Sequence, residues 1–386
     1  MLTGSYDFPQ QDKVVYGKPA AQAIAELAKQ WGIGKLLIIT SASQSGPAGL
    51  LAADLGDLCG GIYSGVSAHS PRSAVVDAAA MARSVGAEML VSFGGGSATD
   101  ATKVVQLCLW AGVERVEELD DYALGPHWSP AKTSGFPAGV RMVTVPTTLS
   151  AGDFNPLAGV KNEITQAKEA YVHPLMAPRG VVLDPAVTIA TPPDLWFSTG
   201  LRAVDHAIEQ LCAGNRLPFA DALGAEGLRQ LVQGFDGVLA SPEDLGARQQ
   251  CQFGMWMTIS ALVASQGKGG PSHAIGHTLG GGHNVPHGYT SCVILPSVLQ
   301  WTESFCADRQ AYVSELMGAP GQPASKVVRD LVRRLGLPTT LREVGIGRDK
   351  FRVIAEHTML DPGVKASPRP ISSINDVIEI LELAAE

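Results

Sequence analysis

The chain has 386 residues, of which 45% are hydrophobic and 17% charged, and its net charge is −8 at pH 7. A chain of this length exceeds what one hydrophobic core usually supports, so we expect two domains. The negative charge and the lack of a Lys/Arg run argue against nucleic acid as a partner. The sequence has neither an unbroken apolar run long enough to span a membrane nor the pattern of a secretory signal, so we expect a cytoplasmic protein.

The first half of the chain alternates apolar runs with helical patterns. Helices are predicted over 20–31 and 71–85. Buried strands are predicted at 35–40, 89–93, 141–146 and 180–184. Strands that alternate with helices are typical of a parallel α/β sheet, which binds its ligands at the carboxyl ends of the strands.

The second half of the chain lacks clear strand patterns. Long helices are predicted at 201–212, 220–234 and 247–266, and Thr191-Pro192-Pro193 is a plausible start for the first helix of this half. We therefore expect an α/β domain over residues 1–187 and an all-helical domain over residues 188–386.

A glycine-rich segment, Gly94-Gly95-Gly96-Ser97, follows one predicted strand and leads into a helical pattern over 98–109. Glycine lets a diphosphate approach the backbone, and a helix N-terminus supplies N–H donors. The segment is not the G-x-G-x-x-G dinucleotide motif, because position 99 is threonine. A tight strand-to-helix turn is the alternative, but three glycines exceed what a turn needs, so the pattern favours phosphate binding.

A second polar segment follows the strand at 141–146. Its hydroxyl residues, which include Thr147 and Thr148, could line a nucleotide pocket or cap a helix. Both interpretations stay open at this point.

Four of the nine histidines fall between positions 273 and 287. His273 and His277 are four residues apart, so on a helix they share one face. Pro286 and Gly288 bracket His287 in a turn-like segment that could return a third imidazole to that face. Clustered imidazoles indicate metal binding, proton transfer or both.

Arg202 and His206 lie one turn apart on the predicted helix 201–212. The guanidinium of Arg202 would hold a carboxylate through a bidentate pair, next to His206. The alternative is an exposed salt bridge from Arg202 to Glu209 or another acid.

In order and spacing, a series of short motifs over nearly the whole chain resembles the iron-containing alcohol dehydrogenase superfamily. The motifs are Val15-Tyr16-Gly17, Gly94-Gly95-Gly96-Ser97-x-x-Asp100-x-x-Lys103, Pro146-Thr147-Thr148, Asp184-Pro185, Thr199-Gly200, His206-Ala207-Ile208-Glu209 and His273-x-x-x-His277 through His287-Gly288. The resemblance implies the dehydroquinate synthase-like fold: a dinucleotide-binding α/β domain with a parallel sheet, a helical catalytic domain, and NAD(P) in the cleft between them.

The resemblance also implies which residues bind NADH or NADPH. These are Ser41, Gly94, Gly95, Gly96, Ser97, Asp100, Lys103, Thr147, Thr148 and, by looser analogy, Lys168. Many family members have an aspartate near the adenosine ribose where this chain has Ser41. Without that carboxylate a 2′-phosphate is not repelled, so we expect NADPH to be accepted along with NADH.

The metal-binding members of the family differ from this chain at one position. They have an aspartate one helical turn before His206, and this chain has Arg202 there. That aspartate and three histidines, which correspond to His206, His273 and His287, ligate iron or zinc in those members. A permanent cation would repel a divalent metal, so we expect no catalytic metal; if one is bound, the same three histidines would hold it.

One branch of the family, the maleylacetate reductases, is similar to this chain in Thr147-Thr148-Leu149-Ser150, His69-x-Pro71 and Pro368-Arg369-Pro370. Its members reduce the carbon–carbon double bond of a small dicarboxylate, maleylacetate, to give 3-oxoadipate in bacterial breakdown of aromatic compounds, and a homodimer is the family expectation. The resemblance suggests Arg202 as the carboxylate- or enolate-binding group and His206, His273 and His287 as its hydrogen-bonding neighbours. His277 is the first candidate for the proton donor.

Three other functions remain open at this point. One is a metal-dependent (iron or zinc) alcohol or aldehyde dehydrogenase of the same family. Another is a zinc-dependent lyase of the dehydroquinate synthase group, against which Arg202 argues. The third is a non-catalytic nucleotide-binding protein, which the dense polar cluster makes a poor explanation because buried imidazoles are costly without partners.

Overall fold

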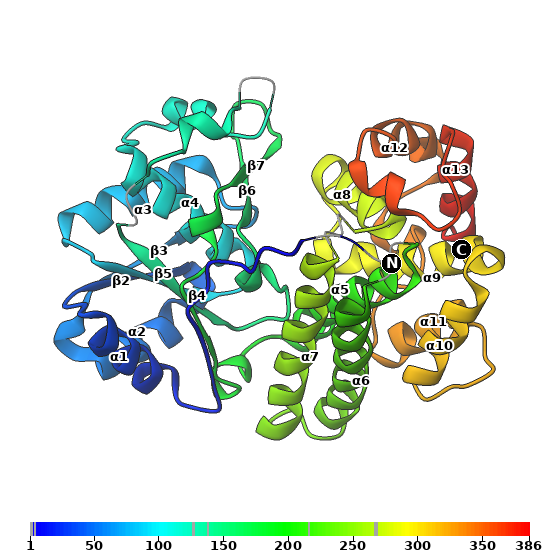
Figure 1. Ribbon diagram of the computed structural model, residues 1–386, viewed down its shortest axis with the longest axis horizontal. Helices are drawn as coiled ribbons and strands as arrows, with labels where there is room; N and C mark the ends of the chain where they lie inside the picture. The colour runs from blue at the N-terminus through cyan, green and yellow to red at the C-terminus, as the bar shows by residue number, and fades with distance from the viewer. Residues whose placement is uncertain (1–2, 4, 126–127, 137–138, 215–216, 266–268) are drawn as a thin grey trace. The chain divides into compact units, whose positions relative to one another are not determined.

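The computed structural model of the chain describes residues 1–386 except 1–2, 4, 126–127, 137–138, 215–216 and 266–268 (Figure 1). It divides into two compact units. The first comprises Phe8–Ala190, and the second comprises Thr191–Glu386 with the described part of the first seven residues.

The first unit is built on a six-stranded sheet in the order β1-β8-β5-β4-β2-β3, and every neighbouring pair is parallel. The strands of the unit are β1 (Lys13–Tyr16), β2 (Leu36–Ser41), β3 (Cys59–Val66), β4 (Met89–Gly94), β5 (Arg141–Pro146), β6 (Leu157–Lys161), β7 (Lys168–Val172) and β8 (Gly180–Leu183). Strands β6 and β7 form a separate antiparallel pair. The predicted parallel sheet is confirmed, whereas β1, β3, β6 and β7 were not expected, because they are short or only partly buried and lack a continuous apolar run.

Helices cover both faces of the sheet. They are α1 (Ala20–Trp31), α2 (Ser45–Leu55), α3 (Arg72–Ser84) and α4 (Gly96–Ala111). Helices α1 and α2 pack on one face with Leu36 and Ile38, while α3 and α4 pack on the other with Leu37 and Ile39 (Figure 1). Successive residues of a strand point to opposite faces, so burial on both sides explains the unbroken apolar run of β2.

The direction of winding reverses between β2 and β4. From β2 the chain passes to β3 at one edge, and then returns to place β4 on the other side of β2. The hydroxyl of Thr40 at the end of β2 donates to the carbonyl of Phe93 in β4 at 2.7 Å. In parallel α/β sheets, ligands bind beyond the carboxyl ends of the strands at such a switch point. Ser41 and the 94–97 segment both lie there.

In the second unit, the described residues from 191 onward form helices and no strands. The α-helices are α5 (Pro193–Cys212), α6 (Pro218–Ala240), α7 (Leu245–Ala264), α8 (Pro271–His283), α9 (His287–Thr302), α10 (Ala307–Leu316), α11 (Ala324–Arg334), α12 (Phe351–Thr358) and α13 (Ile374–Leu383). The predicted helical domain is confirmed, and its first helix begins at Pro193 as expected; Gln266, the predicted end of the helix that forms α7, lies outside the described residues. None of the described helices is both long and apolar enough to cross a membrane.

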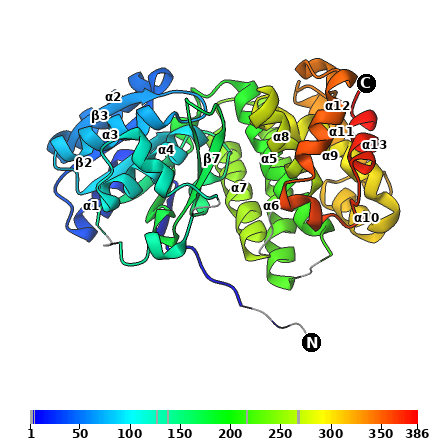
Figure 2. The same ribbon diagram turned by 90° about the horizontal axis from the view of Figure 1, so that it is seen from above.

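The core of the second unit depends on close helix packing. Both views show α5, α6 and α7 side by side (Figures 1 and 2). Glycines let α6 and α7 approach closely: a Cβ at Gly254 would lie 2.7 Å from Leu231 Cγ and 2.8 Å from the Gly227 carbonyl oxygen. A second apolar cluster joins α8 and α9 to α12 and α13, and so fixes the helices that carry the histidines.

Candidate active site

The glycine-rich segment forms the turn from β4 into α4. Gly94 has φ +149°, a backbone conformation that favours glycine, and a Cβ at Gly95 would lie 3.0 Å from Thr148 Cγ2. The backbone geometry of the turn therefore requires glycine at two positions. This supports the alternative that the sequence left open, a tight strand-to-helix turn. The first N–H groups of a helix have no partner within the helix, so the start of α4 also suits an anion. Phosphate binding stays a prediction.

The two charged residues expected to support the cofactor are held by protein groups. Lys103 is fully buried, and its Nζ donates to the carbonyl oxygens of Gly152 at 2.6 Å and Leu157 at 2.7 Å. Burial lowers the pKa of Lys103 to about 8. Asp100 Oδ2 lies 3.7 Å from Lys168 Nζ. These contacts tie β6 and β7 to α4, and direct contact of Asp100, Lys103 or Lys168 with a cofactor remains a prediction.

The hydroxyl residues expected near the cofactor lie at the last residue of β2 and directly after β5. Ser41 Oγ lies 3.1 Å from Ser43 Oγ, and Thr148 Oγ1 donates to Ser150 Oγ at 3.3 Å. Thr147 is buried, and its N–H donates to the Gly94 carbonyl at 2.9 Å, next to the glycine turn.

The histidines proposed as site residues come together in the second unit: His206, His273, His277 and His287. Ring centroids lie 4.9 Å apart for His206 and His273, 6.4 Å for His273 and His277, and 5.8 Å for His277 and His287. His206 and His273 are buried, whereas the side chain of His277 is 46% exposed and His287 is exposed. The cluster therefore runs from the interior to the surface of this unit.

A sharp helix–helix connection places His287 beside His277. Helix α8 ends at His283, and the next residue, Asn284, has a left-handed φ of +57°. The N–H of Val285 then donates to the Leu279 carbonyl at 3.2 Å. Asparagine tolerates this conformation better than most residues. Helix α9 then begins at His287, after Pro286, so the expected return of a third imidazole to the α8 face is seen.

Arg202 lies beneath the exposed histidines. It is 6% exposed, its NH1 donates to Ser291 Oγ at 3.2 Å, and NH1 lies 3.8 Å from Asp205 Oδ2. Its NH2 is 3.5 Å from Nε2 of His277. A Cβ at Gly276 would lie 3.3 Å from Arg202 NH1, so the missing side chain there makes room for the guanidinium. The alternative of an exposed surface salt bridge is wrong for Arg202.

Glu209 orients His273 and was not identified as a site residue from the sequence. Its carboxylate accepts the backbone N–H groups of Gly270 at 2.5 Å and Ser272 at 2.6 Å, and it lies 2.6 Å from His273 Nδ1. Burial raises the pKa of Glu209 to about 7 and lowers that of His273 to about 3. A carboxylate that accepts a hydrogen bond from one ring nitrogen sets the tautomer of an imidazole. Glu209 therefore determines whether the other nitrogen of His273 donates or accepts a hydrogen bond.

Asp361 plays the corresponding part for His277. Its Oδ2 lies 2.8 Å from His277 Nδ1, although the two residues are 84 positions apart. Burial alone would raise the pKa of Asp361, but the hydrogen bond from His277 lowers it below its usual value. No sequence motif marks Asp361, because only the packing of α8 against α12 and the 362–366 turn brings it there.

Possible metal ligands are present, although they differ from the expected set. Asp205, Glu209 and His273 offer ligand atoms that all lie within 4.8 Å of one another, and they fit a divalent ion by type and spacing. The buried nitrogens His206 Nδ1 and His273 Nε2 have no hydrogen-bond partner among the described residues. The family set of three histidines and an aspartate does not fit, because the Arg202 guanidinium takes the place of the aspartate. The expectation of a site without metal is therefore not supported by the ligands present.

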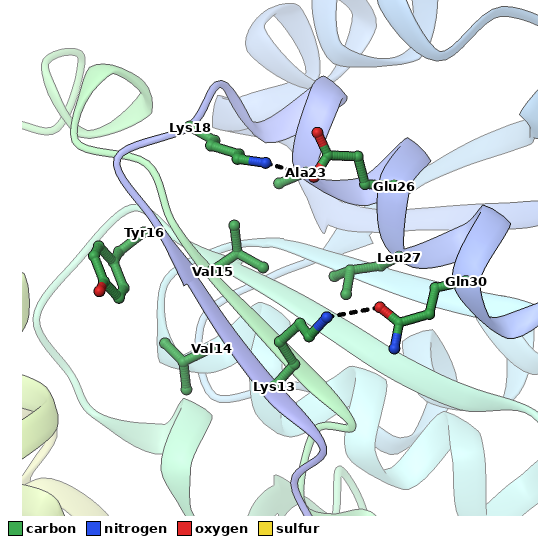
Figure 3. A pocket seen from close by; sticks show the side chains of 9 residues that line it. All are labelled: Lys13, Val14, Val15, Tyr16, Lys18, Ala23, Glu26, Leu27 and Gln30. Atoms are coloured by element: carbon green, nitrogen blue, oxygen red, sulfur yellow. Dashed lines mark hydrogen bonds and ion pairs between the residues drawn. The ribbon is translucent and has the colours of Figure 1, made fainter.

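One cavity of about 280 Å³ lies away from all predicted site residues, between β1 and α1 (Figure 3). Figure 3 shows two hydrogen-bonded pairs at its rim, Lys13 with Gln30 at 2.7 Å and Lys18 with Glu26 at 2.6 Å. Neither pair has a chemical relation to the histidine cluster, and we assign the cavity no role in the reaction.

Comparisons with known proteins agree with this architecture. The family model "Iron-containing alcohol dehydrogenase" matches residues 11–185, and "Fe-containing alcohol dehydrogenase family, C-terminal" matches 196–385. The chain is 29% identical to a maleylacetate reductase of Rhizobium sp. (strain MTP-10005), over 93% of this chain and 92% of the relative. It is 31% identical to the dehydrogenase FUM7 of Gibberella moniliformis, over 96% of each chain. The crystal structure of maleylacetate reductase from Agrobacterium tumefaciens matches with a TM-score of 0.83 at 27% identity, over 100% of this chain and 99% of that chain.

Fold and comparisons together define a dehydrogenase-type oxidoreductase that is similar to maleylacetate reductases. The chain belongs to the iron-containing alcohol dehydrogenase family. The maleylacetate reductase and the dehydrogenase FUM7 are about equally similar to this chain, so the substrate does not follow from similarity alone.

Proposed function

We propose that this enzyme is a maleylacetate reductase, which uses NADH or NADPH to reduce the double bond of maleylacetate to 3-oxoadipate. The observation that carries the proposal is the buried guanidinium of Arg202, whose NH2 lies 3.5 Å from the half-exposed imidazole of His277. A cation beside a solvent-accessible proton carrier suits a dianionic substrate whose reduction passes through an enolate.

The reaction has two steps. A bound reduced nicotinamide would supply hydride to the alkene carbon β to the ketone, and the electron pair of the double bond would move to form the enolate. A proton then adds to the α carbon, which restores the ketone. The enzyme must stabilise negative charge on one oxygen and deliver one proton.

Arg202 supplies the positive charge in this proposal. Ser291 and Asp205 hold its guanidinium in place, so little reorganisation is needed when charge develops on the substrate. A guanidinium binds a carboxylate or an enolate oxygen through directed N–H donors. Arg202 therefore accounts for both dicarboxylate recognition and enolate stabilisation.

His277 is the proposed proton donor because the environments of the four histidines differ. Burial lowers the pKa of His206 well below its usual value and that of His273 to about 3, so both rings stay neutral near pH 7 and act as hydrogen-bonding neighbours. His277 is half-exposed, and Asp361 fixes the orientation of its ring. His287, exposed and stacked on His277, completes the outer part of the cluster.

The cofactor is proposed to bind with its phosphates on the 94–97 turn, at the switch point of the sheet. Ser41 at the end of β2 adds no negative charge there, which supports acceptance of both NADH and NADPH. The homodimer and the cytoplasmic location stay predictions from the sequence.

The proposed reaction needs no metal. A metal ion held by Asp205, Glu209 and His273 would act as a Lewis acid on a substrate oxygen, and Arg202 is proposed to take over that task. Metal analysis of the purified enzyme by mass spectrometry tests this without reference to activity. Wild-type enzyme should carry far less than one equivalent of iron or zinc, and Arg202→Asp, which adds an anionic ligand beside the histidines, should retain more.

Consumption of NADH with freshly generated maleylacetate tests the function directly, using chelator-treated enzyme and following NADH absorbance. Rapid turnover without added metal supports the proposal. No turnover with or without iron or zinc would exclude maleylacetate as the substrate.

A second candidate is a metal-dependent alcohol or aldehyde dehydrogenase, which the Asp205, Glu209 and His273 group favours. In that case chelated enzyme would be inactive on every substrate, and iron or zinc would restore oxidation of a simple alcohol.

A further inference from the structure

Helix α8 carries a stripe of residues, four positions apart, that runs from the interior of the second unit to its surface. His273 is 4% exposed, the side chain of His277 is 46% exposed, and Gly281 is exposed. Residues four apart on a helix lie on one face, so Gly281 continues the face that carries these two histidines. Nε2 of His273 is buried and has no hydrogen-bond partner among the described residues, which leaves a polar group on this face for a ligand.

Neither packing nor backbone conformation explains the glycine at position 281. Its φ lies outside the left-handed region that favours glycine, and a Cβ there would meet no heavy atom of the described chain within 4 Å. Glycine is also one of the poorest helix formers, so alanine would favour α8 more. The missing side chain therefore has to be explained by something other than the folding of α8.

A side chain at position 281 would cover His277. The Cα–Cβ bonds of a helix tilt toward its N-terminus, so a helical side chain lies over the turn that precedes its own Cα. For position 281 this is the turn of His277, whose Nε2 is 3.5 Å from Arg202 NH2. The glycine therefore leaves the imidazole uncovered on this side.

Protein groups occupy other sides of His277. Asp361 Oδ2 lies 2.8 Å from its Nδ1, and the ring of His287 is stacked on it with 5.8 Å between centroids. A Cβ at Gly280 would lie 3.2 Å from His287 Nδ1, so the glycine at position 280 makes room for α9. The side over Gly281 is thus an approach to His277 that the described part of the second unit leaves open.

We propose that Gly281 is an access residue: its missing side chain opens the path by which the substrate reaches His277, and the size of residue 281 limits which substrates bind. This inference rests on the proposed function, in which His277 donates the proton. Arg202, beneath His277, would hold a carboxylate, and the adjoining part of the substrate would lie over Gly281. The last turn of a helix carries partial negative charge, so we expect an uncharged part of the substrate there.

Gly281→Leu and Gly282→Leu form a matched pair of variants. Gly282 is also exposed, and a Cβ there would also meet no heavy atom of the described chain within 4 Å, so each variant replaces one unconstrained glycine of the same turn. Position 281 lies about 40° around the helix from His277, whereas position 282 lies about 140° away. A leucine at position 282 would lie over Thr278 instead.

The first readout is the modification of His277 by diethyl pyrocarbonate in the full-length protein without substrate, followed by peptide mass spectrometry. Gly281→Leu should slow this modification severalfold, and Gly282→Leu should leave it at the wild-type rate. Gly281→Ala should show the same effect to a smaller extent, and it serves as the test if leucine destabilises the protein.

The second readout is steady-state kinetics. For maleylacetate, kcat/KM should fall about 10- to 100-fold in Gly281→Leu, chiefly through a higher KM, because the leucine displaces the substrate from its productive position. Gly282→Leu should keep the wild-type kcat/KM. Chemical denaturation should show both leucine variants to be at least as stable as the wild type.

Three outcomes would overturn the proposal. The first is modification of His277 in Gly281→Leu at the wild-type rate. The second is an equal effect in Gly282→Leu, because leucine would then act through the helix and not by covering His277. The third is slower modification with unchanged kcat/KM. If the wild type does not reduce maleylacetate, the proposed function fails, and the modification of His277 still decides whether Gly281 controls access to it.

Discussion

Arg202→Met tests the proposed chemistry most directly. Methionine keeps an unbranched chain in the buried space of Arg202 and removes the guanidinium. Loss of one preorganised donor to a developing oxyanion costs about 3–4 kcal/mol, so kcat/KM for maleylacetate should fall about 10²- to 10³-fold. Because Arg202 is also proposed to bind a carboxylate of the substrate, KM should rise as well as kcat fall.

The same substitution also affects stability, and this has to be separated from catalysis. It leaves Asp205, which is 0% exposed, without its cationic neighbour. An unpaired buried charge costs about 3–5 kcal/mol of stability. Asp205 keeps the hydroxyl donors Ser272 and Ser291, and burial already raises its pKa. The loss of stability should therefore fall at the low end of this range. The double variant Arg202→Met/Asp205→Asn should recover part of this stability and none of the activity.

Steady-state kinetics of NADH consumption and chemical denaturation, run on the same preparations, measure the two effects. The loss of one such donor should cause far more than a threefold fall in kcat/KM. If kcat/KM of the single variant stays within about threefold of the wild type, Arg202 has no role in the reaction. A double variant that regains full activity would show that Arg202 serves stability alone.

Three further predictions concern other parts of the molecule. Asp361→Asn should lower kcat about 10- to 100-fold with little change in KM, because the ring of His277 loses its orienting carboxylate; an unchanged kcat would exclude His277 as the proton donor. The rate at which iodoacetamide alkylates Cys306 should rise with pH and reach half its maximum near pH 6, because the thiolate is the reactive form and the pKa of Cys306 is lowered to about 6. A half-maximal rate near pH 8.5, about the usual pKa of cysteine, would contradict this. Gly254→Ala should destabilise the protein by about 1–3 kcal/mol in denaturant unfolding, whereas Gly281→Ala, where a Cβ meets nothing within 4 Å, should be neutral or stabilising.

The sequence by itself determined the two-part architecture and most of its elements. The buried strand β2 and the amphipathic helix α1 were predicted almost to the residue, because burial on two faces or on one face imposes a local pattern on the chain. The convergence of His273, His277 and His287 was also predictable, because helical spacing and a Pro-flanked turn are local features. Strand β3 was missed, since a partly buried edge strand containing three glycines carries no such pattern.

Only the tertiary structure decided how the histidines are supported. Asp361 reaches His277 across 84 positions, and Glu209 reaches His273 across 64, so neither pairing leaves a trace in sequence spacing. Burial, which depends on the packing of distant helices, lowers the pKa of His206 and of His273, although nothing in the sequence marks these two histidines as buried. The same holds for Arg202: the sequence shows a cation one turn before His206, but only the surrounding helices reveal that it is enclosed rather than on the surface.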